Sequence, residues 1–206
     1  MPYDPFVCPS GIPDQYIEDR QVSGKTIRDH ELQVICAGRL VNYKRIDAVI
    51  TACAEFEKDY IRQLTIVGEG QLREDLEKSA KEHSFSERIV FTGRVERDAL
   101  IHMMYQSDVF ALVSEKEVFG LVYLEAMLQG CIVIAAKGGG VDGIIVDGVN
   151  GYLCEQGNSK ELSGILSKIL RMTDAEKKQI SEKAAVTAAQ YSDSQVAKMY
   201  LSNILE

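Results

Sequence analysis

Two glutamates, Glu117 and Glu125, occupy the part of the sequence best suited to chemistry. An apolar segment at 108–113 precedes them, and residues 120–128 are apolar except for Glu125 and one tyrosine. A carboxylate inside so apolar a helix is costly to bury unless a partner pairs with it. The spacing predicts that Glu117 lies just before the helix and Glu125 about two turns inside it. Both carboxylates can then face one crevice above the strand ends.

The start of this helix adds hydrogen-bond donors to the same place. The first turn of a helix has unpaired N–H groups and the positive end of the helix dipole, which suit a phosphate. The segment therefore combines acceptors for hydroxyl groups with donors for an anion, as a nucleotide-sugar requires. The spacing alone leaves a simpler interpretation open, in which Glu117 is a solvated loop charge and Glu125 caps a neighbouring backbone.

The elements that would position these residues form a repeating pattern of strands and helices. Short apolar runs, expected as strands buried on both faces, occupy 32–37, 64–67, 89–91, 109–113 and 131–135. Helical spacing occupies 45–58, 71–83, 97–106 and 119–129, with further helices near 159–171, 174–190 and 192–205. The alternation predicts the α/β class: a doubly wound, parallel, Rossmann-like sheet with a helical C-terminal appendage.

The chain divides into three expected parts. Residues 1–30 form a lead-in that follows the interdomain linker, and its segment 3–13, punctuated by prolines, is expected to be extended. Residues 31–190 form the Rossmann-like domain, and residues 191–206 form a final helix.

Candidate binding residues follow the predicted strands, where ligands bind in sheets of this kind. Arg39 and Lys44 follow the first strand and offer phosphate oxygens a planar fork and a point charge. The other candidates follow the later strands: Gly68, Gly93, Arg94, Val95, Glu117, Val118, Phe119, Gly120, Leu121 and Glu125.

The composition excludes several classes of protein. A chain of 206 residues with 46% hydrophobic residues is typical of one globular domain. Its net charge of −8 argues against nucleic-acid binding. No apolar run approaches the roughly 18 residues of a membrane span, and the N-terminus carries no secretory signal. The 5 cysteines are widely spaced, so a cytoplasmic protein with reduced thiols and no metal site is expected.

Several short motifs together resemble the donor-binding half of the group 1, or GT4-like, retaining glycosyltransferases. Members of that family have the GT-B fold of two facing Rossmann-like domains. The matching stretches occur in the family's order, across about residues 7–205: 37–40, Lys44, 66–70, 90–93, 147–152 and the Glu-x7-Glu segment at 114–127.

The resemblance implies a role for each candidate residue. Glu117 would contact hydroxyls of the donor sugar, and Glu125 would hold the ribose hydroxyls. Arg39 and Lys44 would bind the diphosphate together with backbone N–H groups of residues 118–121. No bound metal would be needed, because cations and a helix dipole can stabilise the leaving diphosphate.

Two departures from the family pattern concern the same region. Val118 stands where many members have glycine, which adds a Cβ that faces the donor and could narrow the choice of sugar. Residues 140–144 lack a glutamate that members often carry there. The glycine-rich stretch 137–143 is therefore expected to be a structural turn, although a phosphate-facing role stays open.

The resemblance also implies a larger enzyme. A complete GT-B glycosyltransferase carries an N-terminal acceptor-binding domain, through which peripheral membrane contact is conceivable. This chain is expected to be the C-terminal donor-binding domain of an enzyme of polysaccharide or glycoconjugate synthesis, inactive alone. It would bind a nucleoside-diphosphate-sugar based on UDP or GDP. Two alternatives stay open: another GT-B enzyme, such as a nucleotide-sugar epimerase or hydrolase, or a non-catalytic nucleotide-binding module.

Overall fold

The chain folds around one parallel sheet. The computed structural model describes residues 10–18, 31–56 and 60–205. The sheet has the strand order β3-β2-β1-β4-β5-β6, and every neighbouring pair is parallel. The strands are β1 (Leu32–Ala37), β2 (Ile61–Val67), β3 (Ile89–Gly93), β4 (Val109–Leu112), β5 (Ile132–Ala136) and β6 (Tyr152–Cys154). The predicted doubly wound α/β class is therefore confirmed.

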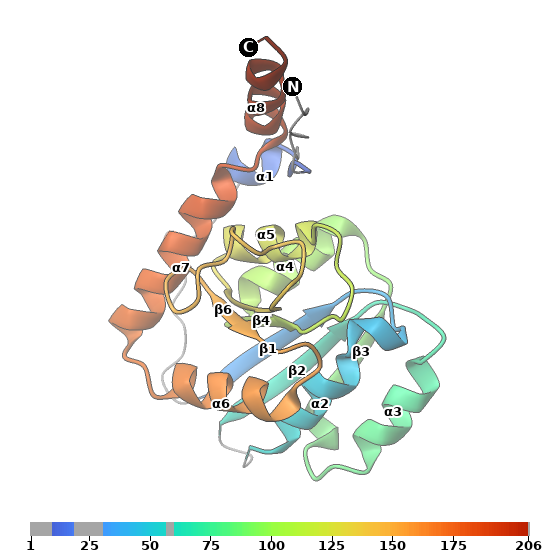
Figure 1. Ribbon diagram of the computed structural model, residues 1–206. Coiled ribbons are helices and arrows are strands. Elements are labelled where there is room, and N and C mark those ends of the chain that lie inside the picture. The colour runs from blue at the N-terminus through green and yellow to red at the C-terminus, as the bar shows by residue number, and fades with distance from the viewer. Residues whose placement is uncertain (1–9, 19–30, 57–59, 206) are drawn as a thin grey trace.

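Helices cover both faces of the sheet (Figure 1). On one face lie α2 (Ile46–Ala54), α3 (Arg73–Lys81) and α6 (Ser159–Leu170). On the other lie α4 (Arg97–Gln106), α5 (Leu121–Leu128) and α7 (Asp174–Ala189). The central strands β4 and β5 are consequently buried along their whole length, which explains their unbroken apolar sequences.

Two strands differ from the sequence-based expectation. β2 begins three residues earlier than the apolar run predicts, because the polar side chains of Arg62 and Gln63 conceal its start. β6 has no counterpart among the predicted strands. It is only 3 residues long, and pairing with β5 defines it, with Tyr152 beside Ile134.

Helix α5 begins later than expected, which moves Glu125. Gly120 precedes the helix with a φ of 76°, a left-handed conformation that cannot belong to a right-handed helix. The helix therefore starts at Leu121, and Glu125 lies just over one turn inside it rather than two. Gly120 is also packed tightly, since a Cβ there would come within 2.5 Å of the Tyr123 ring.

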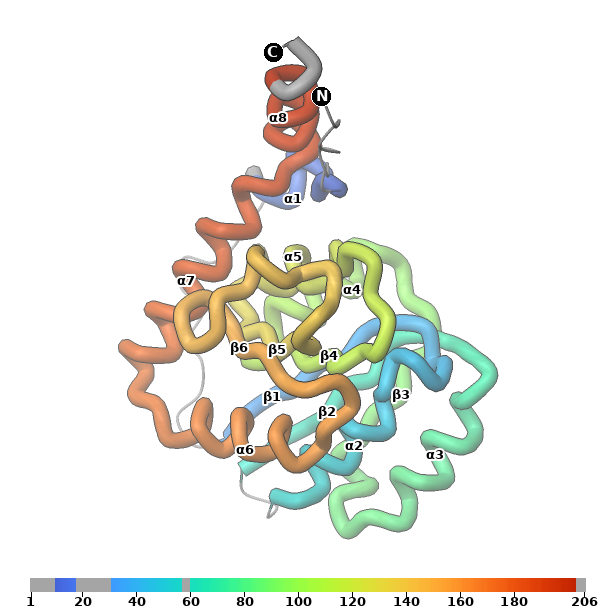
Figure 2. Tube along the Cα trace, in the orientation of Figure 1, coloured from blue at the N-terminus to red at the C-terminus, as the bar shows by residue number. Residues whose placement is uncertain are grey.

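Two helices from opposite ends of the described chain meet beside the main body, the first lying next to the start of the second, which extends away from the domain (Figures 1 and 2). These are α1 (Gln15–Glu18) and α8 (Asp193–Leu205). The Ile12 N–H donates to the Tyr191 carbonyl at 2.8 Å, and the Asp193 N–H donates to the Ile12 carbonyl at 2.9 Å. The final helix was expected, whereas α1 was not; it falls inside the predicted lead-in, just after the segment 3–13 that was expected to be extended. The rest of that lead-in, residues 1–9 and 19–30, lies outside the described residues.

The described cysteines are buried, reduced thiols, as expected. They are Cys36, Cys53, Cys131 and Cys154, and Cys8 lies outside the described residues. Burial raises the pKa of the Cys36 thiol to about 12, so it stays protonated and unreactive at neutral pH.

Gly68 should not tolerate a side chain, because the loops after β1 and β2 touch through their backbones there. Its φ is +136°, and an added Cβ would collide with the Gly38 carbonyl oxygen. We expect Gly68→Ala to lower the free energy of unfolding by about 1–3 kcal/mol. In helix α6, where nothing lies within 4 Å of a Cβ at Gly164, Gly164→Ala should raise it by about 1 kcal/mol. Denaturant unfolding measures both, and equal effects of the two substitutions would contradict the packing argument.

Candidate functional site

A cavity of about 1150 Å³ opens at the carboxyl edge of the sheet. Its walls are the loops that follow β1, β2, β3 and β4 together with the first turns of α4 and α5. The strand order reverses between β1 and β4, so these loops leave the sheet in opposite directions and open a crevice. The cavity lies at this reversal.

Eleven of the twelve candidate residues from the sequence line this one cavity. They are Arg39, Lys44, Gly68, Arg94, Val95, Glu117, Val118, Phe119, Gly120, Leu121 and Glu125. The exception is Gly93, which is buried below the lining at the end of β3. Its φ is +74°, and an added Cβ would lie 2.7 Å from a carboxylate oxygen of Glu69. Gly93 thus serves the backbone turn rather than the cavity surface.

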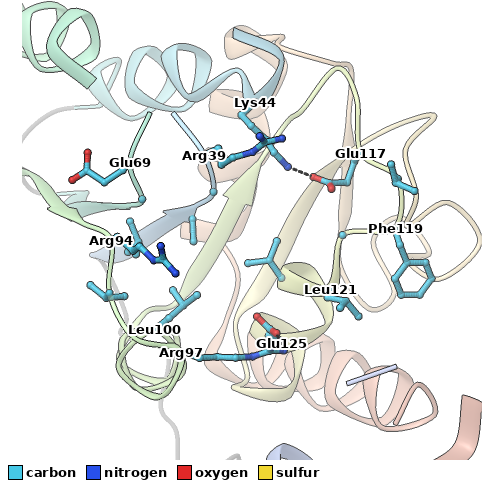
Figure 3. A pocket seen from close by; sticks show the side chains of 18 of the residues that line it. Arg39, Lys44, Glu69, Arg94, Arg97, Leu100, Glu117, Phe119, Leu121 and Glu125 are labelled. Carbon is cyan, nitrogen blue, oxygen red and sulfur yellow. Dashed lines mark hydrogen bonds and ion pairs between the residues drawn. The ribbon is translucent and has the colours of Figure 1, made fainter. Parts of the chain in front are cut away.

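Lys44 and Glu117 form an ion pair at one end of the cavity (Figure 3). Lys44 Nζ lies 2.5 Å from Glu117 Oε2, and the two side chains are only 13% and 15% exposed. Lys44 closes the short 3-10 turn Asn42–Lys44 after β1, whereas Glu117 comes from the loop after β4. Glu117 is therefore not a solvated loop charge. Its position beside Lys44 depends on the pairing of β1 with β4, which brings the loops after these two strands together.

Arg97 and Glu125 form a second ion pair at the other end of the cavity (Figure 3). The Glu125 side chain is 7% exposed, and that of Arg97 is 45% exposed. Burial raises the pKa of the Glu125 carboxyl, and the nearby Arg97 charge opposes that rise. Glu125 therefore pairs with a side chain and caps no backbone. Arg97 was not among the candidate residues from the sequence. It is the first residue of the helix that follows β3, and ligands of such sheets bind where the strands end, so its position could have indicated its role.

Cations outnumber carboxylates along the cavity, although the whole chain has a net charge of −8. The charged lining residues are Arg39, Lys44, Arg94, Arg97, Lys116, Glu69, Glu96, Glu117 and Glu125. Arg39 donates a hydrogen bond to the Tyr43 hydroxyl and lies over that ring, 5.8 Å from its centre. Since no side chain caps the start of α5, its first-turn N–H groups are open to a ligand. The cavity thus favours an anion that also carries hydroxyl groups.

The glycine-rich turn supports the cavity wall from behind. The Gly140 N–H donates to the Glu117 carbonyl at 3.1 Å, and an added Cβ on Gly140 would collide with the Val118 carbonyl oxygen. The turn contributes no residue to the cavity lining. Its structural role agrees with the sequence-based expectation. Val118 belongs to the cavity lining and is 97% exposed, and its expected position facing the donor stays a prediction.

Within the described ranges, no group of three or more His, Cys, Asp and Glu side chains is arranged to hold a metal ion. The same part of the chain contains no helix that is both long and apolar enough to cross a membrane.

Comparisons with known proteins agree with this architecture. The family model described as glycosyl transferases group 1 matches residues 18–186. N-acetyl-alpha-D-glucosaminyl L-malate synthase of Bacillus anthracis is 31% identical over 145 residues, which cover 70% of this chain and 38% of that enzyme. Anabaena Alr3699/HepE, solved in complex with UDP-glucose, has a TM-score of 0.73 and 26% identity, over 94% of this chain and 54% of that one. Lipopolysaccharide outer core galactosyltransferase WaaB has a TM-score of 0.79 at 20% identity, over 97% and 55%, and shows the shared fold.

The fold and the comparisons define the class of protein: a Rossmann-like domain of the kind found in GT-B glycosyltransferases. The chain belongs to the group 1 glycosyltransferase family. It covers less than half of the Bacillus relative and about half of the Anabaena one, at 38% and 54% of their lengths.

Replacing Glu125 with glutamine should stabilise the free protein at neutral pH. The folded-state pKa of Glu125 is raised, so the folded chain binds this proton more readily than the unfolded chain does. The unfolding free energy therefore falls as the pH rises from the unfolded pKa through the folded pKa. Glu125→Gln removes this fall. At pH values above the folded pKa the variant should therefore have a higher unfolding free energy, by on the order of 1 kcal/mol, and below about pH 4 it should differ little from the unaltered chain.

Urea unfolding across this pH range measures the effect. Glu182→Gln, which removes a 59% exposed carboxylate on α7, should change the unfolding free energy by less than about 0.5 kcal/mol and serves as the control. A less stable Glu125→Gln variant at neutral pH would mean that the Arg97 pair outweighs the cost of burial.

Proposed function

We propose that this chain is the donor-binding domain of a retaining glycosyltransferase that transfers a sugar from a nucleoside-diphosphate-sugar to an acceptor hydroxyl. The observation that carries the proposal is the cavity itself. It gathers two shielded carboxylates, several arginine and lysine side chains near them and an uncapped helix start at the reversal of strand order. Such a site can hold hydroxyl groups and a diphosphate at the same time.

In this proposal the two ends of the cavity have different tasks. Glu125 accepts hydrogen bonds from the ribose hydroxyls, and Glu117 accepts them from the donor sugar. Arg39, Lys44 and the N–H groups at the start of α5 bind the diphosphate and stabilise the charge that develops on it as it leaves. These cations do the work that a metal does in other transferases, so the site needs none. The complex of the Anabaena relative with UDP-glucose supports a donor of this class.

The Lys44–Glu117 pair gives the site a simple order of events. Lys44 pairs with Glu117 within the cavity. An arriving diphosphate competes for the ammonium group and thereby leaves Glu117 with unpaired acceptor capacity beside the sugar. The pair therefore holds Glu117 in place at this end of the cavity until a donor binds.

In this proposal the described residues do not bind the acceptor. We infer that a second, N-terminal domain of the cytoplasmic enzyme holds the acceptor, so that the present chain binds donor but transfers no sugar unaided. Positioning two substrates against each other can supply roughly 7–11 kcal/mol of barrier lowering, which one wall of a cleft cannot provide.

Binding of a nucleoside diphosphate is the direct test of this function. At a hundredfold excess over its dissociation constant, the ligand should stabilise the chain by about 2.7 kcal/mol. Thermal shifts with uridine, guanosine and adenosine diphosphates measure this and identify the base. Lys44→Ala should weaken binding roughly tenfold or more through loss of a charged hydrogen bond. Lys178→Ala, a change at a 71% exposed lysine on α7, should leave it unchanged. The absence of any shift at millimolar ligand would refute the proposed function.

The two acids should separate the nucleotide from the sugar. Glu125→Gln should weaken both the bare nucleoside diphosphate and the sugar-bearing donor, because both contain ribose. Glu117→Gln should weaken only the sugar-bearing donor, and by freeing Lys44 it should leave the bare nucleotide bound at least as tightly. Losses of roughly 1.5–3 kcal/mol are expected for each affected complex. Isothermal titration calorimetry with both ligands decides the matter, and equal losses for both ligands in both variants would remove the assignment.

A further inference from the structure

Arg97 lies between the cavity and helix α1 and contacts both. Its guanidinium group pairs with Glu125 inside the cavity. The same group lies over the ring of Tyr16, with Cζ 5.2 Å from the ring centre. Tyr16 belongs to α1 and is not part of the cavity lining. One side chain at the rim thus connects the buried carboxylate to a helix that is not part of the cavity lining.

Tyr16 is itself held in place by several contacts. Its hydroxyl donates to Asp98 at 3.4 Å, next to Arg97 on α4. The chain just before it is fixed to the start of α8, because the Ser194 hydroxyl donates to Asp14 at 2.6 Å and Ile12 exchanges backbone hydrogen bonds with residues 191 and 193. The ring therefore offers Arg97 a defined surface, to which a guanidinium group is attracted.

Glu125 needs such a partner because its carboxylate is largely removed from water. Its side chain is 7% exposed, and it belongs to a helix whose neighbouring residues, Leu124 and Ala126, are fully buried. The ionised carboxylate accepts hydrogen bonds on both oxygens, whereas a protonated carboxyl group also donates one, so a nearby positive charge favours acceptance from hydroxyl groups. Arg97 occupies one of its oxygens, and the other oxygen retains acceptor capacity for a ligand.

We propose that Arg97 is a positioning residue of the donor site, which orients the Glu125 carboxylate toward the ribose hydroxyls and is itself held by the ring of Tyr16. This inference rests on the proposed function, because it assigns the ribose to Glu125. It adds two residues, Arg97 and Tyr16, to the set that determines nucleotide affinity. Arg97 acts through Glu125 and not on the phosphates.

Calorimetry on the 206-residue chain with two matched ligands tests the inference. One ligand is the nucleoside diphosphate that binds best in the thermal-shift series, and the other is its 2′,3′-dideoxy form, which lacks the ribose hydroxyls. Arg97→Gln should weaken the first roughly tenfold and the second hardly at all. Arg97→Lys, which keeps a positive charge, should recover part of the loss.

Variants of Tyr16 test whether its ring holds Arg97 in place. Tyr16→Ala should weaken the nucleoside diphosphate about two- to fivefold, and this effect should vanish when Arg97 is already glutamine. Tyr16→Phe keeps the ring and loses only the hydrogen bond to Asp98, so it should weaken binding less than Tyr16→Ala does. Tyr60→Ala, a change at a 46% exposed tyrosine outside the cavity lining, should leave the affinity unchanged.

The possible outcomes separate the inference from the proposed function. If the unaltered chain binds no nucleoside diphosphate, the proposed function fails. If it binds one and Arg97→Gln weakens both ligands equally, Arg97 contacts the phosphates directly and the positioning role is wrong. The positioning role is also wrong if Arg97→Gln weakens neither ligand. Loss of affinity for the ribose-containing ligand alone, with the dependence on Tyr16, supports it.

Discussion

The pairing of β1 with β4 decides where this protein can bind a ligand. Val34 lies beside Val109 and Ile35 beside Phe110, so the sheet grows from β1 in both directions. The loops after these two strands diverge at the carboxyl edge and leave the crevice between them. Lys44 and Glu117 then meet across that crevice, although 73 positions separate them in the chain. The position of the cavity thus follows from the order of the strands and not from particular side chains.

The two ion pairs of the cavity are not expected to stabilise the free domain. The protein is acidic overall, with a net charge of −8, yet it keeps two of its carboxylates largely shielded from water in one place. Each is balanced by a single cation from a different segment of the chain. A pair of this kind seldom adds stability, because removing the charges from water costs about as much as their attraction returns. Such an arrangement is typical of a site retained for binding.

Glycines set the shape of the cavity through contacts between backbones. Gly68 touches the Gly38 carbonyl between the loops after β1 and β2, and Gly140 touches the Val118 carbonyl behind the loop after β4. A side chain at either place would push a cavity wall out of position. The need for glycine therefore arises in the cavity lining at Gly68 and behind the lining at Gly140.

The sequence by itself determined the class of fold, five of the six strands and nearly every candidate residue of the cavity, because buried parallel strands are continuous apolar runs and ligands bind where such strands end. It did not determine β6, which exists only through its pairing with β5, or the start of α5, which depends on the left-handed backbone of Gly120. Only the tertiary structure showed that Lys44 pairs with Glu117 and Arg97 with Glu125, and that Tyr16 lies against Arg97. Partners so distant in the chain leave no local pattern, because their proximity follows from the order of the strands.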